Sequence, residues 1–410
     1  IVTEWLNYVN PKTPAEARKR HDFARWLEAE NIEMQNIIDM KVIKEMRCDK
    51  PMGVFIHTSR FVYQLKLNTH DGTIDKYKVR LVFRGFTQKK GLDYTNSYAP
   101  VTQIISLKLF MFWSMALKLE FVHLDVKSAF LVPEVQEYLW MKLPEGYDFN
   151  GNKYILLNKT LYGCVQAAYE WFIMFSNIMM DKFNFKRNAI EPCHLVMFDQ
   201  STGIFANLLL HVDNVMVGTN KKPFIEYLIK SVQSNFQLTY ARSESILGVA
   251  VQYDLIKRRV CFSQVSYIIQ LTEKYKPDLS PVQKNPMRSA TENKFKRSQM
   301  GDVPRSKKPY LNLLMALYWC ARSTRHEILS ACVFFAYFSS CYTDELYKEL
   351  EVVLNYLYHT RDNAMVMDLS NYTFDNTKPL HFQLVCDANF ANREDRKSLV
   401  GAFGFIENCL

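Results

Sequence analysis

The sequence predicts an α+β protein, because segments with a strand period and segments with a helix period follow one another along the chain. The segment 207–218 is apolar on both sides of a short polar centre, which indicates a buried β-hairpin. Segments 61–67 and 76–83 alternate with period two and are joined through Asp71-Gly72, a strong tight-turn signal. These two segments indicate a second hairpin.

Helical patterns account for much of the remaining chain. A charged helical stretch surrounds Trp26, and long helical patterns cover 104–119 and 164–182. Residues 277–308 are polar, basic and interrupted by prolines, which predicts loops. Helical periodicity returns over 311–359, so we expect several helices there.

Composition limits the class of protein. With 410 residues, 48% of them hydrophobic, the chain can form about two or three packed domains. A net charge of +9 suits a polyanionic partner such as nucleic acid. Nine scattered cysteines without a Cys-x-x-Cys pair are typical of buried thiols in a reducing, cytoplasmic compartment. Lys108 and Lys118 interrupt the longest apolar run, 104–119, so no membrane span is expected.

Basic residues cover one face of the second strand of the predicted 61–83 hairpin. Lys76, Lys78 and Arg80 should point to one side of this strand. A solvated surface is the ordinary role of such a face, and contact with phosphate groups is the alternative. Lys78 and Arg80 are the candidates for phosphate contact.

Two acids are candidates for metal binding. Asp125 ends the predicted strand 121–125, and Asp213 lies at the tip of the 207–218 hairpin. Rigid, half-exposed carboxylates in such positions suit a pair of Mg²⁺ ions, which prefer anionic oxygen ligands. Read alone, however, an Asp at the end of a strand is more often a turn former or a helix cap.

Seven further patterns follow one another along the chain. In order, they occupy residues 78–88, 98–101, 124–131, 144–147, 161–166, 211–214 and 246–249. Their order and spacing closely resemble the reverse transcriptase of copia-type LTR retrotransposons. The resemblance covers nearly the whole chain.

The resemblance implies a right-hand polymerase with fingers, palm and thumb, in which the palm carries an antiparallel sheet. It divides the chain into an N-terminal leader (1–54), fingers and palm (55–255), thumb and connection (256–375), and a truncated RNase H-like segment (376–410). Asp387 matches the first metal-binding Asp of RNase H. Because RNase H needs further carboxylates from later elements, we expect no RNA hydrolysis by this incomplete site.

The resemblance also implies the catalytic roles. Asp125 and Asp213 match aspartates that would bind two Mg²⁺ ions. Asn214 stands where a further catalytic Asp is usual, and an amide carries no charge to offset two divalent cations. His211 replaces an aromatic residue and Tyr169 a basic one. The expected result is a weak or lost polymerase activity.

Other matched residues are expected to bind the incoming nucleotide. Phe130 matches an aromatic gate that would exclude a 2′-hydroxyl group, and Gln166 matches a glutamine that contacts nucleotide and template. Val126 belongs to the same set, and Lys78 and Arg80 would contact the phosphates.

Two functions remain open. The first is an RNA-directed DNA polymerase that uses an RNA template, a DNA primer and deoxynucleoside triphosphates. It would work in a cytoplasmic virus-like particle beside integrase or other Pol segments. The second is a catalytically inactive retroelement remnant that keeps the fold and binds nucleic acid. Asn214 favours little turnover in both cases.

Overall fold

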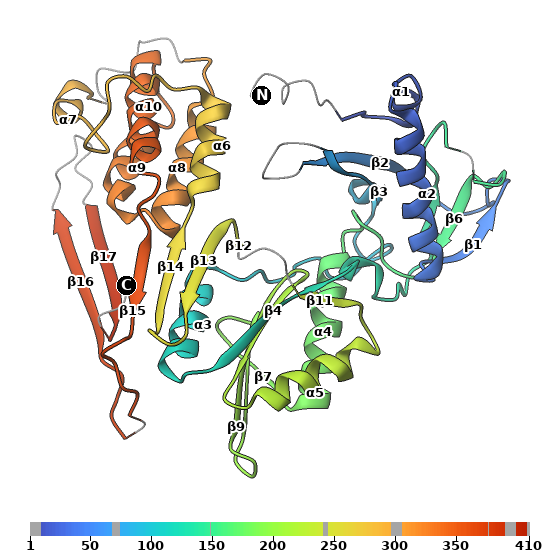
Figure 1. Ribbon diagram of the computed structural model, residues 1–410. Helices are drawn as coiled ribbons and strands as arrows, with labels where there is room; N and C mark the ends of the chain where they lie inside the picture. Colours follow the sequence, from blue (N-terminus) through green and yellow to red (C-terminus); the bar gives the residue numbers. More distant parts are fainter. Residues whose placement is uncertain are drawn as a thin grey trace. The chain divides into compact units, whose positions relative to one another are not determined.

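The computed structural model describes residues 10–67, 74–147, 149–240, 245–296, 306–375, 377–389 and 399–407. Contacts within the chain define two compact units. The first unit comprises Ile1–Thr102 and Phe121–Tyr240, and the second comprises Gln103–Glu120 and Ala241–Leu410. Both units combine helices with β-sheets, which confirms the predicted α+β class (Figure 1). The domain boundaries expected from the resemblance stay a prediction.

The first unit contains two sheets. The strands of one are β1 (Ile43–Arg47), β2 (Ile56–Leu67), β3 (Ile74–Phe83), β5 (Trp140–Lys142) and β6 (Tyr154–Leu157), in the order β1-β6-β5-β2-β3. The strands of the other are β4 (Glu120–Val126), β7 (Lys186–Arg187), β8 (His194–Asp199), β9 (Ile204–His211), β10 (Asn214–Thr219) and β11 (Leu238–Tyr240), in the order β11-β4-β10-β9-β8-β7. The helices are α1 (Pro14–Arg18), α2 (Phe23–Asp39), α4 (Ala167–Phe183) and α5 (Lys222–Gln233), with short 3-10 turns η2 (Gly85–Thr87) and η3 (Ala129–Leu131).

Strands β2 and β3 form the hairpin expected over 61–83. They pair antiparallel from Ser59 opposite Phe83 to Lys66 opposite Lys76. The turn expected at Asp71-Gly72 lies outside the described residues. The antiparallel pairing of β2 with β3 confirms the hairpin itself.

Helix α2 covers the apolar face of this hairpin. Val79 and Leu81 are buried, whereas Lys78 and Arg80 alternate with them and stay partly exposed. Trp26 of α2 is fully buried, with its ring edge-on to two tyrosine rings of the hairpin. The period-two pattern thus assigned the faces of the strand correctly.

The hairpin expected over 207–218 is formed by β9 and β10. Asn214 lies opposite His211, so only two residues make the turn between the strands. Helix α4 packs Trp171 and Phe175 into the same core as the buried residues of β9 and β10. This packing anchors both strands of the hairpin whose tip carries Asp213.

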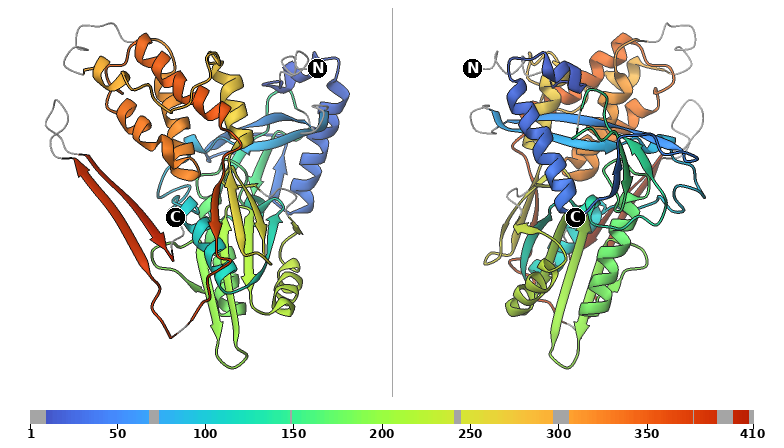
Figure 2. Two further views of the ribbon diagram at one scale, coloured as in Figure 1. Left: turned by 60° about the vertical axis from the view of Figure 1, so that its left-hand side comes forward. Right: turned by 90° about the vertical axis from the view of Figure 1, so that its right-hand side faces the viewer.

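The second unit is mainly helical. Its helices are α3 (Ile104–Ala116), α6 (Val265–Tyr275), α7 (Thr291–Lys294), α8 (Tyr310–Ser323), η5 (His326–Ile328), α9 (Leu329–Ala336) and α10 (Asp344–His359). Its strands are β12 (Ser245–Ile246), β13 (Val249–Asp254), β14 (Arg259–Ser263), β15 (Met365–Asp368), β16 (Phe382–Asn389) and β17 (Leu399–Ile406). They form one sheet in the order β12-β13-β14-β15 and a separate β16-β17 ribbon, visible in Figure 2.

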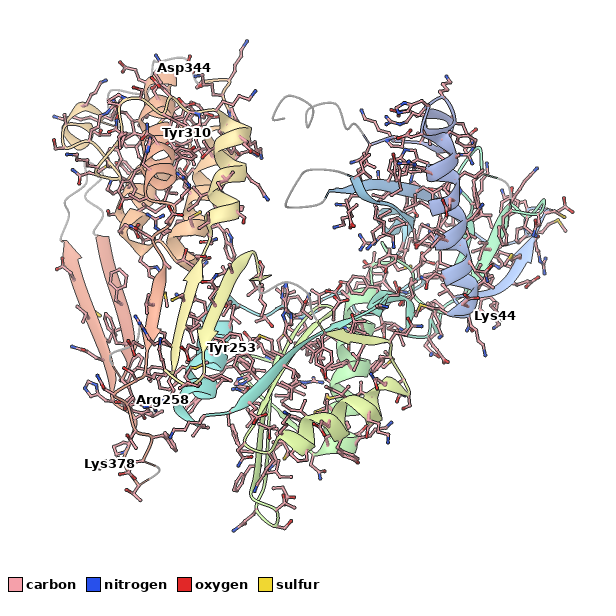
Figure 3. The ribbon with its side chains drawn as sticks, viewed as in Figure 1. Lys44, Tyr253, Arg258, Tyr310, Asp344 and Lys378 are labelled. Carbon is pink, nitrogen blue, oxygen red and sulfur yellow. The ribbon has the colours of Figure 1, made fainter. Side chains whose placement is uncertain are left out.

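The helices predicted at 104–119, 164–182 and 311–359 are confirmed. Helix α3 belongs by its contacts to the second unit. Tyr310, labelled in Figure 3, begins α8. Its ring stacks on that of Tyr342 with centroids 4.5 Å apart. In the described part of 277–308, the only helix is the single turn α7, as the proline content predicts.

The cysteines differ in how deeply they are buried. Within the described ranges the cysteines are free, and Cys164, Cys193, Cys320 and Cys332 are buried. Cys48 and Cys386 are exposed, so the expectation of buried thiols is wrong for these two. Both belong to segments outside the main cores.

No membrane-spanning helix is found in the part of the chain that the structure describes, because none of its helices combines the length and the apolar content that a span requires.

Candidate active site

The two candidate acids lie in one sheet, Asp125 on β4 and Asp213 directly before the neighbouring strand β10. Asp125 is the penultimate residue of β4, and Asp213 occupies the turn between β9 and β10. The backbone N–H of Val126 donates to the carbonyl oxygen of Asp213 at 2.8 Å. This hydrogen bond ties the end of β4 directly to the hairpin tip.

The turn that carries Asp213 is strained. Val212 has a φ of +56°, which is unfavourable for a β-branched residue. The indole N–H of Trp171, from the buried face of α4, donates to the Val212 carbonyl oxygen at 2.6 Å. A fixed donor in the core thus helps to hold an otherwise unfavourable backbone conformation.

Both acids line a cavity of about 580 Å³ within the first unit. The other walls come from one face of α2, the basic face of β3, the segment 125–130 and Tyr162. Lys76, Lys78 and Arg80 all belong to this lining. The structure therefore brings the candidate acids and the candidate phosphate-binding cations to one cavity.

Burial and charge shift the pKa values around this cavity. The pKa of Asp125 is raised by burial and by the nearby Asp213 carboxylate. The pKa of Lys78 is lowered by burial and by neighbouring cations, Arg80 first among them. Burial also raises the pKa of Glu33, whose carboxylate accepts a hydrogen bond from the backbone N–H of Leu81.

Asn214 has both ends of its side-chain amide engaged. Its Nδ2 donates to Oδ1 of Asp213 at 3.0 Å. Its Oδ1 accepts from Nε2 of His123 at 2.9 Å. Because its side chain is a neutral amide, Asn214 supplies no negative charge. The one oxygen of this amide already accepts a hydrogen bond.

The donor set suits a divalent cation only in part. Asp125 and Asp213 offer the hard, anionic oxygens that Mg²⁺ prefers. Over the described ranges, however, no three His, Cys, Asp or Glu side chains are grouped closely enough to bind a metal ion. Asp125 and Asp213 line the same cavity, and the neutral amide of Asn214 adds no further anionic ligand.

Of the three residues expected to bind the nucleotide beside Lys78 and Arg80, two line the cavity and one does not. Val126 and Phe130 line the cavity, with the Phe130 ring edge-on to Tyr162 at 6.1 Å. Gln166 is buried outside the lining, and its amide donates to the Asp93 carbonyl oxygen at 3.0 Å.

Two further residues singled out in the sequence are not part of the cavity lining. The Tyr169 hydroxyl accepts from Asn96 at 3.4 Å. Asp387 is exposed in the middle of β16, opposite Gly401, and belongs to the second unit.

Sequence reasoning missed three residues around the acids. Glu33 and Asn36 of α2 line the cavity, although the first 54 residues were expected to form only a leader. Asn36 also donates to the Ser128 hydroxyl at 3.4 Å. Their spacing of three residues on one helical face was the available signal. His123 could have been found because it precedes Asp125 by two residues and so shares its side of β4.

Comparison with protein families matches residues 41–287 to the family described as reverse transcriptase (RNA-dependent DNA polymerase). This match covers more than half of the chain. Among the solved structures, the chain resembles a foamy viral protease-reverse transcriptase in complex with double-stranded DNA, with a TM-score of 0.45 and 11% sequence identity. That likeness covers 92% of this chain and 53% of the other.

Curated relatives agree with the family match. The chain is 29% identical over 315 residues to the retrovirus-related Pol polyprotein from transposon TNT 1-94 of Nicotiana tabacum, covering 75% of the chain and 23% of that protein. It is 25% identical over 364 residues to the retrovirus-related Pol polyprotein from transposon RE1 of Arabidopsis thaliana, covering 87% and 23%. The chain thus spans about a quarter of the length of these relatives. It belongs to the reverse transcriptase (RNA-dependent DNA polymerase) family, and within that family to the copia type.

Proposed function

We propose that the chain is the RNA-directed DNA polymerase segment of a copia-type Pol polyprotein, and that Asn214 leaves it with strongly reduced nucleotidyl transfer. One observation carries the proposal. Asp125 and Asp213 share a cavity with a cationic strand face, while the Asn214 amide is bound to His123 and Asp213.

Divalent metal ions are general cofactors of reverse transcriptases, and Asp125 and Asp213 would hold Mg²⁺ in this chain. When bound, two such ions supply positive charge against the phosphate that is transferred. Asn214 contributes none of the negative charge that a second ion requires. The hydrogen bond that its Nδ2 donates to Asp213 also competes with a metal ion for one of the few carboxylate oxygens of the site.

The rest of the cavity suits a deoxynucleoside triphosphate. Lys78 and Arg80 offer positive charge for the phosphates. The Arg80 guanidinium lies 5.2 Å from the centre of the Tyr162 ring, which limits its freedom. Phe130 presents a ring in the same cavity, where it would clash with a 2′-hydroxyl group. An RNA template and a DNA primer complete the proposed substrates.

Primer extension tests this proposal. Purified protein is mixed with an oligo(dT) primer, a poly(rA) template, dTTP and Mg²⁺. We expect little extension by the wild-type chain and measurable extension by the Asn214→Asp variant. Robust extension by the wild type would overturn the proposed loss. No extension by the variant, despite template binding, would count against Asn214 as the cause.

A second function is favoured by the same contacts. Because the hydrogen bonds of Asn214 are satisfied, the chain can fold stably without turnover and still bind nucleic acid through its basic surfaces. Template binding without extension in both proteins would support this binding role, with a salt dependence that reflects phosphate contacts. In either case we propose a cytoplasmic virus-like particle, shared with other Pol segments, as the location.

A further inference from the structure

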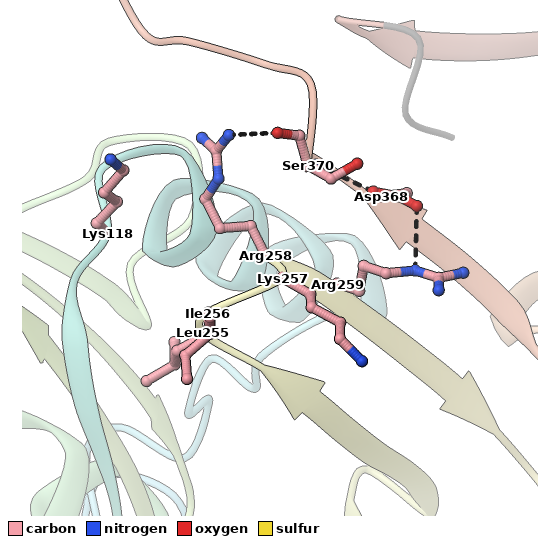
Figure 4. A pocket seen from close by; sticks show the side chains of 8 residues that line it. All are labelled: Lys118, Leu255, Ile256, Lys257, Arg258, Arg259, Asp368 and Ser370. Atoms are coloured by element: carbon pink, nitrogen blue, oxygen red, sulfur yellow. Dashed lines mark hydrogen bonds and ion pairs between the residues drawn. The ribbon is translucent and has the colours of Figure 1, made fainter.

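The second unit contains a basic cavity that is distinct from the candidate active site. Its volume is about 660 Å³. Four cationic residues line it, namely Lys118, Lys257, Arg258 and Arg259, against one carboxylate, Asp368 (Figure 4). The lining comes from the turn between β13 and β14, the residue Lys118 after α3, and the end of β15.

Arg258 is held in place without losing its charge. Its guanidinium donates to the carbonyl oxygen of Ser370 at 2.7 Å and to that of Tyr372. Its backbone φ is +54°, a left-handed conformation within the tight turn that joins β13 to β14. Neutral carbonyl groups orient the guanidinium but leave its positive charge uncompensated.

Two lysines add to this excess of positive charge. Lys118 is exposed, and its ammonium group makes no ion pair or hydrogen bond with the residues that the structure describes. Lys257 is 73% exposed, and the nearest carboxylate, that of Asp254, is 3.9 Å away. Among the cations of this cavity, counting contacts with described residues, only Arg259 has a close carboxylate partner, Asp368 at 3.0 Å. The cavity therefore keeps a clear excess of positive charge.

We propose that this cavity binds phosphate groups, either the phosphate chain of a nucleotide or the backbone of a nucleic-acid strand. An oriented guanidinium and two exposed ammonium groups match the oxygens of adjacent phosphates. The volume is within the range of sites that bind small molecules. Leu255 and Ile256, exposed at the same turn, offer an apolar surface for a sugar or base.

The inference is independent of the proposed polymerase activity, and a binding assay on the full chain tests it. The starting protein carries Lys78→Ala and Arg80→Ala, so that phosphate binding in the first unit is weakened. Inorganic triphosphate and a short oligo(dT) are titrated separately. Lys118→Asn and Lys257→Ala are then added together, with Lys348→Ala as the control because Lys348 is an exposed lysine of α10 outside the cavity. Asn is chosen at 118 because Lys118 has a φ of +52°, which Asn tolerates.

We expect the double substitution to weaken binding of at least one probe about tenfold. The control should leave both affinities unchanged, and unfolding temperatures should be equal in all three proteins. Loss of triphosphate binding alone identifies a nucleotide site. For a nucleic-acid strand, the salt dependence of oligo(dT) binding should fall by about one unit of slope per lysine removed. Absence of binding in the starting protein, or equal affinities in all variants, would overturn the inference.

Discussion

His123 and Asn214 lie on neighbouring strands and are joined by a hydrogen bond of 2.9 Å from the imidazole Nε2 to the amide oxygen. The same amide donates to Asp213 at 3.0 Å. The two hydrogen bonds satisfy both ends of the Asn214 amide. A carboxylate at position 214 would instead repel those of Asp125 and Asp213. The site is therefore better suited to the metal-free state than a site with three acids.

Asn214→Asp should make stability depend on Mg²⁺. A third carboxylate beside Asp125 and Asp213 should lower the unfolding free energy of the metal-free protein by about 1 kcal/mol. Millimolar Mg²⁺ should restore it, because the ion binds only the folded site. Thermal unfolding with and without Mg²⁺ measures both effects. Asn235→Asp, at an exposed position, is the control, and an equal Mg²⁺ response in wild type and variant would contradict the prediction.

Gly163→Ala should disrupt the wall of the candidate active site. Gly163 has a φ of +89°, and a Cβ there would lie 2.2 Å from the Phe83 carbonyl oxygen. We expect a loss of about 3–5 kcal/mol, since the backbone of β3 cannot move aside. Gly151 has a φ of +77° and open space around it, so Gly151→Ala should cost only about 1–2 kcal/mol. Urea denaturation of both variants gives the comparison, and equal losses would refute the steric argument.

Lys108→Met should stabilise the second unit at neutral pH. Burial lowers the pKa of Lys108 from 10.5 to about 8, and its Nζ lies 3.2 Å from His326 Nε2 rather than near a carboxylate. Between these pKa values the unfolded chain binds more protons than the folded chain, so the contribution of Lys108 to stability rises with pH. Below about pH 8 the fold must hold a buried ammonium group.

The gain from Lys108→Met should therefore be largest at or below neutral pH, at about 1–3 kcal/mol, and should shrink as the pH rises toward 10.5. Denaturation of both proteins over this pH range measures the difference, which cancels the titration of the buried tyrosines and cysteines. Lys348→Met is the matched control at an exposed position. A gain that is constant with pH would show that charge burial is not its cause.

Phe130→Ala should relax sugar selection. In the Asn214→Asp background, where extension is measurable, we expect the ratio of ribonucleotide to deoxynucleotide incorporation to rise about tenfold or more. The reason is that removal of the ring leaves room for a 2′-hydroxyl group. Tyr138→Ala, which removes an exposed aromatic ring outside the cavity, should leave the ratio unchanged. The measurement is single-nucleotide extension with each substrate, and an unaltered ratio would exclude Phe130 as the gate.

Local sequence was sufficient for the elements that carry the candidate site. The 207–218 hairpin follows from apolar residues on both sides of a short polar turn. The 61–83 hairpin follows from period-two alternation, because each of its strands has one face that must be buried. The same alternation placed Lys78 and Arg80 on one face of β3. The order of the motifs was enough to identify the family. These properties depend on neighbours along the chain, so they can be read without a structure.

Other properties depend on residues that are distant in sequence. The spacing of Glu33 and Asn36 indicates a shared helical face but not that this face lines the cavity. In the same way, the position of His123 on β4 does not show that it binds Asn214. Nor does the sequence indicate that Gln166 donates to the Asp93 carbonyl oxygen. Partners of this kind are set by how helices and sheets pack, and spacing along the chain does not encode them. The sequence alone determined the family, the strand faces and the missing acid. Only the tertiary structure decided what the amide at 214 binds and which distant elements form the walls around it.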